Sequence, residues 1–500
     1  MALASVSVAS ERVEHMSGSP PAEGRVVVIG AGIAGLAAAH RLLQRGARVT
    51  VLEASDRVGG KLLPGEIAGA RVDLGAESML ARRPEAVGLA REVGLADRLR
   101  PPATATAFLW TRGALRPMPK GHVMGVPGTA SALTGVLSDE GLARIERDAD
   151  LPRTEVGDDV AVGEYVAGRL GREVVDRLVE PLLGGVYAGD AYRISMRSAV
   201  PQLFQIAKTH TSLTEGVREI QAKAAAAQQT GPVFTGITGG IGTLPLAVAD
   251  AVRARGGEIL TGTPVTELRR EASGGWRVAA GDRVLRADAV VVAVPAPAAA
   301  RLLRPEAPEA AAELAAVEYA SMALVTLAYR RADIALPDGS SGFLVPPVDG
   351  HTIKASTFAS QKWGWIAEEN PDVVVVRTSV GRYGETEILQ RDDAGLVEAS
   401  RHDLKAATGL DAAPVETRVT RWTDGLPQYP VGHHARVARV REHLGKLPGL
   451  AVCGAQYDGV GIPACIASAY AAVDQLGGDL GGVQELTANP VQSLHGGAGE

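Results

Sequence analysis

The chain has few cysteines, no strong excess of charge and few aromatic residues. Only Cys453 and Cys465 occur among 500 residues, which excludes a disulfide framework or a site of four thiolates and favours a reducing compartment. Lysine and arginine total 51 against 57 aspartate and glutamate residues, so no global positive field attracts nucleic acid or an anionic membrane. Any anionic ligand must therefore be bound by local basic residues.

No segment predicts a transmembrane helix or a signal peptide. The longest charge-free stretch, 224–249, contains five glycines and two prolines, which excludes a spanning helix. Residues 1–24 lack a basic start and an apolar core, so we expect them, like 479–500, to form disordered tails. We expect a cytoplasmic protein, with peripheral contact to a membrane left open.

A strand, a glycine-rich turn and a helix near the N-terminus carry the clearest functional signal. The apolar run 26–29 is typical of a parallel strand buried on both faces. The next residues are Gly30, Ala31, Gly32, Ile33, Ala34 and Gly35. A helical pattern then continues to Gly46, and a second strand, 48–52, ends at Glu53. This order of elements predicts a dinucleotide site.

The residue types match what such a site requires. Gly30 permits the tight turn, Gly32 allows the backbone to approach a pyrophosphate, and Gly35 allows the helix to pack closely on the strand. The helix start offers free N–H groups, and Glu53 would accept the ribose hydroxyls. The glycine clusters at 239–242 and 459–461 lack a following acid at the right distance. We interpret both as turns and expect one dinucleotide.

The next segments indicate which dinucleotide is bound. The run 53–61, followed by 72–78, resembles the extended dinucleotide motif of the superfamily of flavin amine oxidases, phytoene desaturases and protoporphyrinogen oxidases. This resemblance implies FAD held along its whole length. In the superfamily, the helix that follows Pro463 resembles the element that faces N1 and the C2 carbonyl of the flavin. Its positive dipole end would stabilise negative charge on the reduced ring, while a plain strand–helix connection is the alternative.

Segments in the middle of the chain resemble one branch of that superfamily. The ranges 115–121, 180–190, 239–245, 422–429 and 459–466 are similar to the bacterial coproporphyrinogen III oxidase branch of the protoporphyrinogen oxidase family, and the likeness extends over 25–476. By this resemblance the FAD contacts are Gly30, Ala31, Gly32, Ile33, Ala34, Gly35, Glu53, Ala54, Lys61, Gly75, Ala76, Glu77, Ser78, Val265, Trp422, Val460, Gly461 and Ile462.

The resemblance implies a reaction and its partners. Coproporphyrinogen III would be oxidised to coproporphyrin III in haem biosynthesis, in three two-electron steps that each reduce O2 to H2O2. Plant and animal relatives carry an arginine where this chain has Ala107, which favours coproporphyrinogen III over protoporphyrinogen IX. Transient contact with a ferrochelatase is a further implication. The alternatives are a protoporphyrinogen IX oxidase, a flavin amine oxidase, which an aromatic content of 4% disfavours, and a non-catalytic tetrapyrrole carrier with structural FAD.

Four propionates on that substrate require basic partners, and the macrocycle requires an apolar shelf. The candidate cations are Lys120, Arg82 and Arg83, followed by Lys208, His210, Arg193 and Arg382. The candidate shelf residues are Val186, Leu344 and Val345, for which a place in the core is the alternative. No catalytic residue can be assigned. No metal site is expected, because His433 and His434 would point to opposite faces of a strand.

These observations predict an α/β (α+β) fold in three parts. A discontinuous Rossmann-like FAD-binding domain would comprise 25–85, 231–300 and 446–478. A mixed-sheet substrate-binding domain would comprise 86–120 and 301–445, and a helical region 121–230. Strands at 263–267 and 287–295 would return the chain to the FAD sheet.

Overall fold

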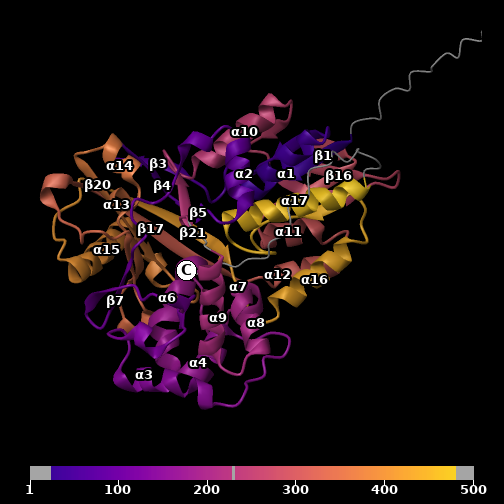
Figure 1. The fold of residues 1–500 in the computed structure, drawn as a ribbon. Helices are drawn as coiled ribbons and strands as arrows, with labels where there is room; N and C mark the ends of the chain where they lie inside the picture. The colour runs from indigo at the N-terminus through magenta and orange to yellow at the C-terminus, as the bar shows by residue number, and fades with distance from the viewer. Residues whose placement is uncertain (1–23, 228–230, 480–500) are drawn as a thin grey trace, which may run out of the picture.

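The computed structural model describes residues 24–227 and 231–479. A five-stranded sheet and a seven-stranded sheet organise these residues, and a group of helices lies beside both. In Figure 1 the helices of the five-stranded sheet lie at the upper right, the seven-stranded sheet at the left and the further helices at the bottom. Apart from Gly24 and Asp479, the two predicted tails fall outside the described residues.

The five-stranded sheet is entirely parallel. Its strands, in spatial order, are β12 (Glu258–Leu260), β2 (Arg48–Leu52), β1 (Arg25–Ile29), β16 (Ala289–Val292) and β22 (Leu450–Val452). The sequence prediction that β1 is a central, parallel strand is confirmed. Its apolar residues are buried because helices cover one face and a second sheet covers the other. Three separated parts of the chain therefore build one sheet.

Helices α1 (Ile33–Gln44), α10 (Thr243–Ala254) and α17 (Ile462–Asp479) cover one face of the parallel sheet. The other face packs against the antiparallel strands β13 (Val265–Arg270), β14 (Trp276–Ala280) and β15 (Arg283–Ala287) and the helices α11 (Ala296–Leu303), α12 (Pro308–Ala315) and α16 (His433–Leu444).

One strand prediction for this region was wrong. The segment expected at 263–267 to join the parallel sheet is β13, which pairs only with β14 in the small antiparallel sheet. The reason is that a short turn at 271–275 connects β13 to β14, and a connection of that length allows only antiparallel pairing. The other expected strand, β16, does join the parallel sheet.

The seven-stranded sheet is mixed. Its strands, in spatial order, are β21 (Glu416–Pro427), β17 (Tyr319–Arg330), β20 (Val373–Val380), β19 (Ile353–Thr357), β18 (Gly342–Leu344), β7 (Phe108–Thr111) and β8 (Ala114–Pro117). Helix α15 (Asp393–Thr408) covers one face, where it shares a core with alternate residues of β17 and β20. The opposite face of this sheet packs against the other elements of the molecule.

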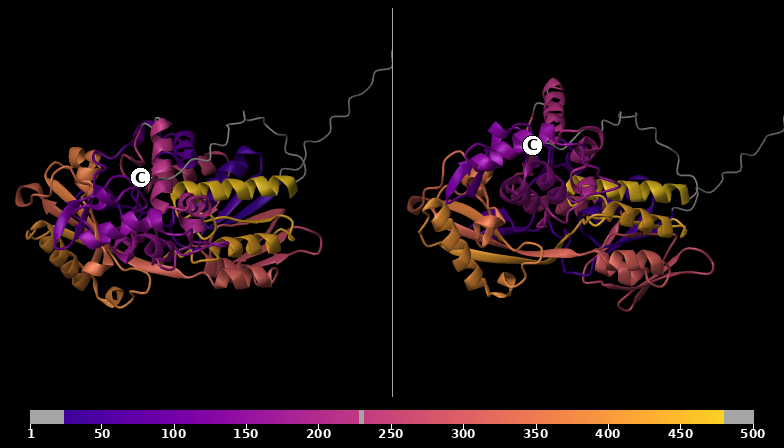
Figure 2. Two further views of the ribbon diagram at one scale, coloured as in Figure 1. Left: turned by 60° about the horizontal axis from the view of Figure 1, so that its bottom comes forward. Right: turned by 90° about the horizontal axis from the view of Figure 1, so that it is seen from below.

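The third part is mainly helical. Its helices are α3 (Asp139–Glu146), α4 (Val162–Leu170), α5 (Arg172–Val174), a π-helical turn (Val175–Val179), α6 (Glu180–Tyr187), α7 (Met196–Ala199), α8 (Pro201–Thr209) and α9 (Leu213–Ala226). They enclose a core of their own. In both views of Figure 2 the two sheets lie toward opposite ends and the helices lie over the middle. The domain boundaries drawn from the sequence stay a prediction.

The remaining elements are short. They are β3 (Pro64–Ile67), β4 (Ala70–Asp73), β5 (Met79–Leu80), α2 (Pro84–Glu92), β6 (Leu99–Arg100), β9 (His122–Val123), β10 (Val126–Pro127), β11 (Phe234–Ile237), α13 (Ala359–Lys362) and α14 (Gly364–Glu369). Asp73, at the end of β4, accepts hydrogen bonds from the N–H groups of Ile241 and Gly242 at 2.8 Å each. The glycine cluster 239–242 is therefore a turn, as predicted, and it binds a carboxylate of this chain.

Close packing between β1 and α1 depends on a glycine. A Cβ atom at Gly35 would overlap the carbonyl oxygen of Gly30 and lie 3.2 Å from the Cβ of Ala293. At Gly88 in α2, by contrast, an added Cβ meets no atom within 4 Å.

We expect Gly35→Ala to lower the melting temperature, because overpacking a core contact costs about 1–3 kcal/mol. Gly88→Ala is the matched control and should raise the melting temperature slightly, since alanine is favoured over glycine in a helix by about 1 kcal/mol. Thermal denaturation of both variants measures the difference. Equal melting temperatures would show that the contact between β1 and α1 relaxes freely.

Candidate flavin and substrate site

The glycine-rich turn after β1 forms an open cradle at the carboxyl edge of the parallel sheet. Gly30 has a φ of +104°. Gly32 caps α1 without a side-chain hydrogen bond, and an added Cβ there meets no atom within 4 Å. The N–H of Gly59 donates to the carbonyl of Ala31 at 2.8 Å, which places a second glycine turn beside the first. The free N–H groups of α1 and this open space suit a pyrophosphate.

Glu53 is held at the same edge. One carboxylate oxygen accepts the N–H of Ala31 at 2.8 Å, and the other accepts the N–H and hydroxyl of Ser55 at 2.9 and 2.8 Å. Each oxygen retains acceptor capacity for a ribose hydroxyl. Ala54 is exposed beside it. The N–H of Thr263 donates to the Glu53 carbonyl at 2.8 Å, which places Val265, the first residue of β13, near the same edge.

Residues from three distant segments meet next to this cradle. A Cβ at Gly75 would overlap the carbonyl oxygen of Lys61 and lie 3.3 Å from the ring of Trp422. The Trp422 indole N–H donates to the carbonyl of Leu74 at 3.0 Å. Burial lowers the pKa of Lys61. The structure therefore brings Lys61, Gly75 and Trp422 together, and their contact with FAD stays a prediction.

Glu77 has partners that the sequence analysis did not find. Its carboxylate pairs with Lys362 of α13 and with Arg377 of β20, at 2.7 Å each, and Arg377 also donates to the carbonyl of Gly75 at 2.8 Å. The Glu77 side chain therefore anchors a loop. Arg377 was detectable, because it is the one charged residue of β20 and directly follows four valines. Ala76 is exposed, and Ser78 is half-buried.

These cations determine the protonation of Glu77. Burial by itself raises the pKa of this carboxyl, but attraction to Lys362 and Arg377 and their hydrogen bonds outweigh burial. The pKa is therefore lowered from its usual value, and the carboxylate is ionised at neutral pH.

The start of α17 lies near the centre of the molecule (Figure 1). It follows Val460 and Gly461, and its first two residues are Ile462 and Pro463. Val460 packs against the core of the helical part, and an added Cβ at Gly461 finds only Pro463 within 4 Å. The positive end of this helix dipole therefore lies at the junction of the parallel sheet and the helical part.

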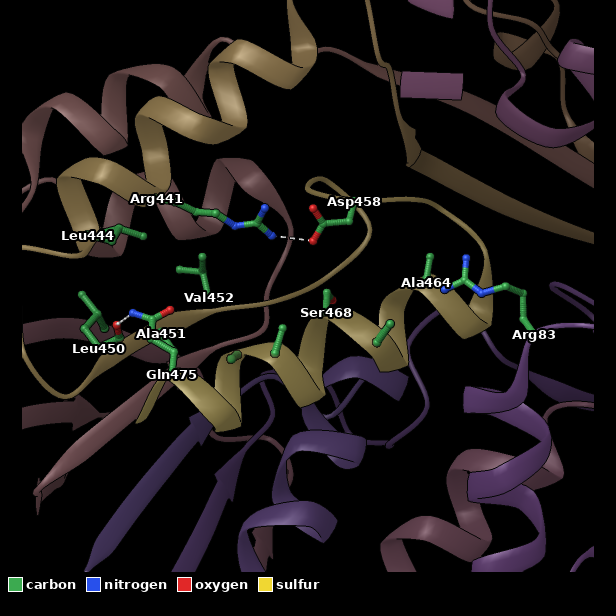
Figure 3. A pocket seen from close by; sticks show the side chains of 13 residues that line it. Arg83, Arg441, Leu444, Leu450, Ala451, Val452, Asp458, Ala464, Ser468 and Gln475 are labelled. Atoms are coloured by element: carbon green, nitrogen blue, oxygen red, sulfur yellow. Dashed lines mark hydrogen bonds and ion pairs between the residues drawn. The ribbon is translucent and has the colours of Figure 1, made fainter. Parts of the chain in front are cut away.

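The expected substrate cations do not gather in one place. Lys120 and Arg82 are exposed. Arg83 pairs with Glu85 at 2.6 Å and lines a cavity of about 390 Å³ beside α16, β22 and α17 (Figure 3). Arg441 and Asp458 form an ion pair in this cavity at 2.5 Å. No residue of α6, β18 or β19 lines it, so Arg83 lies apart from the expected shelf.

Two of the three expected shelf residues lie on facing elements. Val186 on α6 is 46% exposed, and Leu344 on β18 is half-buried. An added Cβ at Gly185, next to Val186, would lie 3.7 Å from Leu344. Val345 is fully buried in the core beneath α15. Val345 directly follows β18 and shares that core with Phe343, so the alternative of a core position holds for this residue and the shelf position does not.

The four lower-ranked cations are also separated. Lys208 lies over the ring of Phe204 at 4.9 Å, and His210 pairs with Glu219 at 2.7 Å, both in the helical part. Arg193 contacts Glu318 at 2.8 Å. Arg382 alone among them lies beside the shelf strand, where it donates to the carbonyl of Val345 at 3.2 Å.

The histidine pair lies on a helix and not on a strand, which corrects the sequence interpretation. His433 is the first residue of α16, its Nε2 contacts the carbonyl oxygen of Tyr457 at 3.0 Å, and its ring stacks on Tyr429. Across 24–227 and 231–479, no group of three or more His, Cys, Asp or Glu side chains could hold a metal ion. Within the same ranges, no helix has the length and hydrophobicity needed to cross a bilayer.

Comparison with known proteins identifies the class to which this site belongs. Residues 33–477 match the model of the flavin-containing amine oxidoreductase family, so the chain belongs to this family of enzymes. The open cradle at Gly32 and the anchored Glu53 fit a flavin nucleotide.

The names of individual similar proteins are more specific than the name of the family. The chain is 38% identical to the coproporphyrinogen III oxidase of Mycobacterium tuberculosis (strain ATCC 25618 / H37Rv), over 89% of this chain and 96% of that protein. It is 34% identical to the coproporphyrinogen III oxidase of Bacillus subtilis (strain 168), over 90% and 97%. A crystal structure of a candidate protoporphyrinogen oxidase from Exiguobacterium sp. 255-15 matches with a TM-score of 0.80 and 32% identity, over 91% and 99%.

We expect Glu77→Gln to lower the melting temperature at pH 7, because it leaves Lys362 and Arg377 without a carboxylate, at a cost of about 3–5 kcal/mol. A carboxyl whose pKa is lowered by folding stabilises the protein above its unfolded value of 4.5. That contribution is lost as the pH falls through the lower folded value.

Melting curves at pH 7 and pH 4 test this expectation. The difference between wild type and Glu77→Gln should be smaller at pH 4. Glu369→Gln, which breaks the exposed ion pair with Arg71, is the control and should cost less than about 1 kcal/mol. A loss for Glu77→Gln no greater than for Glu369→Gln would contradict the proposed anchoring role.

Proposed function

We propose that this protein is an FAD-dependent oxidase that converts coproporphyrinogen III to coproporphyrin III in haem biosynthesis. The observation that carries the proposal is identity of 34–38% to proteins of that name, over about nine-tenths of both chains. Three O2 molecules would accept six electrons and six hydrogens from each substrate, releasing three H2O2. The proposed location is the cytoplasm, and transient contact with a ferrochelatase stays a prediction.

The arrangement of the cradle supports FAD as the form of the flavin. Free N–H groups at the start of α1 suit the pyrophosphate, and Glu53 suits the adenosine ribose. The start of α17 lies at the other end of the site and suits the flavin ring. A bound flavin supplies the capacity to accept a hydride and to pass electrons to O2.

The residues of this chain would mainly hold and orient the macrocycle. Leu344 and Val460 both pack against the edge of the same helical core, so the start of α17 and the expected shelf share one boundary. Trp422 lies on β21, on the side of the cradle. A porphyrinogen between these elements would present its meso carbons to the flavin ring, and orientation of this kind contributes to the rate.

A second candidate reaction is the oxidation of protoporphyrinogen IX. The structural similarity to the Exiguobacterium protein favours it. Ala107, which stands where plant and animal relatives carry an arginine, disfavours it, because a propionate anchor is missing there. A flavin amine oxidase and a non-catalytic carrier stay as further alternatives, which the same assay separates.

We expect the purified protein to release H2O2 with coproporphyrinogen III and to show a kcat/KM at least tenfold higher than with protoporphyrinogen IX. One additional charged contact of about 1.4 kcal/mol produces such a ratio. Peroxide and porphyrin fluorescence are measured together for both substrates. Equal kcat/KM values would contradict the substrate preference, and binding without peroxide would favour a carrier.

We expect noncovalent FAD, released on denaturation, because both cysteines are buried and burial raises the pKa of the Cys465 thiol to about 12.

Glu53→Ala should weaken FAD binding about tenfold or more, through loss of a charge-assisted hydrogen bond of about 1.5–3 kcal/mol. Flavin absorbance after gel filtration and the Kd of reconstituted apoprotein measure this change.

Glu398→Ala, on the exposed surface of α15, is the control and should keep wild-type FAD occupancy. Unchanged occupancy in Glu53→Ala would show that another residue binds the ribose. Flavin that stays with acid-precipitated protein would contradict noncovalent binding.

A further inference from the structure

Lys354 occupies an irregular position in the seven-stranded sheet. Ile353 pairs with Val380 and Ala355 pairs with the adjacent Ser379, so Lys354 is an extra residue in β19. Such a bulge leaves one residue without a paired residue on the neighbouring strand. Ile353 enters the core beneath α15, whereas the Lys354 Nζ donates to the carbonyl of Gly381 at 2.7 Å and lies 3.9 Å from the sulfur of Met322.

The neighbours of Lys354 connect it to the glycine-rich cradle on one side and to the expected apolar shelf on the other. Met322 pairs with Trp422 across β17 and β21, and Trp422 contacts the cradle at Gly75. On the other side, the carbonyl of Lys354 accepts the N–H of Val345, which follows Leu344. Leu344 faces α6 at Gly185. Lys354 is therefore adjacent both to the flavin side and to the apolar shelf.

The charge of Lys354 is not balanced locally. Lys354 is only 7% exposed, and the hydrogen bonds of its amine go to a carbonyl and to a thioether sulfur, neither of which carries a negative charge. Arg382, which is 8% exposed, lies close enough to repel it. The nearest counter-charge, Glu385, is 3.3 Å from Arg382 and is itself partly exposed. A buried ammonium without an anion is costly.

The protonation of this group reflects that cost. Burial first, and then repulsion by Arg382, lower the pKa of Lys354 to about 7, while Glu385 acts in the opposite direction. Burial likewise raises the pKa of Glu180, at the start of α6, to about 7, and Arg382 opposes this shift. An anion that bound beside Lys354 and Arg382 would be attracted by both cations and would favour the charged ammonium.

We propose that Lys354, with Arg382 behind it, binds one carboxylate of the tetrapyrrole substrate. This inference rests on the proposed function. An ammonium has three N–H donors. The carbonyl of Gly381 accepts one and the sulfur of Met322 accepts a second, so one donor stays available for a propionate. The carboxylate would fix one edge of the macrocycle next to the shelf, and the ring would then extend toward the side of Trp422 and the flavin.

The test compares Lys354→Met, which keeps the length of the side chain and removes its charge, with Lys354→Arg, which keeps the charge. The Kd of coproporphyrin III is measured by fluorescence titration of the flavin-loaded protein. Coproporphyrin III tetramethyl ester, which has the same ring without carboxylates, is the second ligand. Lys446→Met, on the exposed segment after α16, is the matched control.

We expect Lys354→Met to raise the Kd of coproporphyrin III about tenfold, corresponding to roughly 1.4 kcal/mol. The Kd of the tetramethyl ester should stay within twofold, and Lys354→Arg should recover most of the affinity for the acid. In turnover of coproporphyrinogen III, the loss should appear mainly in KM. Lys354→Gln is measured in parallel and should show the same pattern if the methionine variant folds poorly.

Three outcomes would overturn the proposal. An unchanged Kd in the neutral variants, with wild-type turnover of coproporphyrinogen III, would reject the role of Lys354 and leave the proposed function intact. Equal losses for the acid and the ester would show that Lys354 only supports the shape of the site. If wild type neither binds coproporphyrin III nor oxidises the porphyrinogen, the proposed function and this inference both fail.

Discussion

The carboxylate of Glu77 joins the glycine-rich cradle to the seven-stranded sheet. Glu77 follows Gly75 on the segment beside the parallel sheet, whereas its partners Lys362 and Arg377 lie on α13 and β20. Because Arg377 also binds the carbonyl of Gly75, one set of charge-assisted contacts holds the backbone that approaches Lys61 and Trp422. The shape of the cradle on this side therefore depends on residues 285 and 300 positions away in the chain.

The long strands β17 and β21 extend this connection to the substrate side. Each has twelve residues, and their pairing places Met322 beside Trp422. Because Ile353 faces the core beneath α15, alternation along β19 directs the next side chain, Lys354, to the opposite face, where it lies near Met322. The irregularity at this point leaves Lys354 without a paired residue on β20.

The proposed reaction requires mainly that the protein hold and orient its substrate. The described residues supply an anion cradle, two helix starts, an apolar boundary at Leu344 and Val460, and two buried cations, Lys354 and Arg382. A porphyrinogen combines an apolar ring with carboxylates at its rim, and this combination of surfaces suits such a molecule. A small neutral amine would bring no carboxylate to the buried ammonium of Lys354.

Local patterns in the sequence determined the dinucleotide turn, because strand, glycines, helix and acid lie within 30 consecutive residues and each has its own backbone requirement. They also determined the central strand β1 and the start of α17. Only the tertiary structure decided that β13 leaves the parallel sheet, that Val345 faces the core, and that Arg83 lies apart from Leu344. The place of Lys354 and the pairing of Glu77 with Lys362 and Arg377 were equally out of reach, although Arg377 by itself was detectable as a charged residue in a strand. The physical reason is that strand order, bulges and ion pairs between distant segments depend on how sheets pack, and no local period in a sequence records that packing.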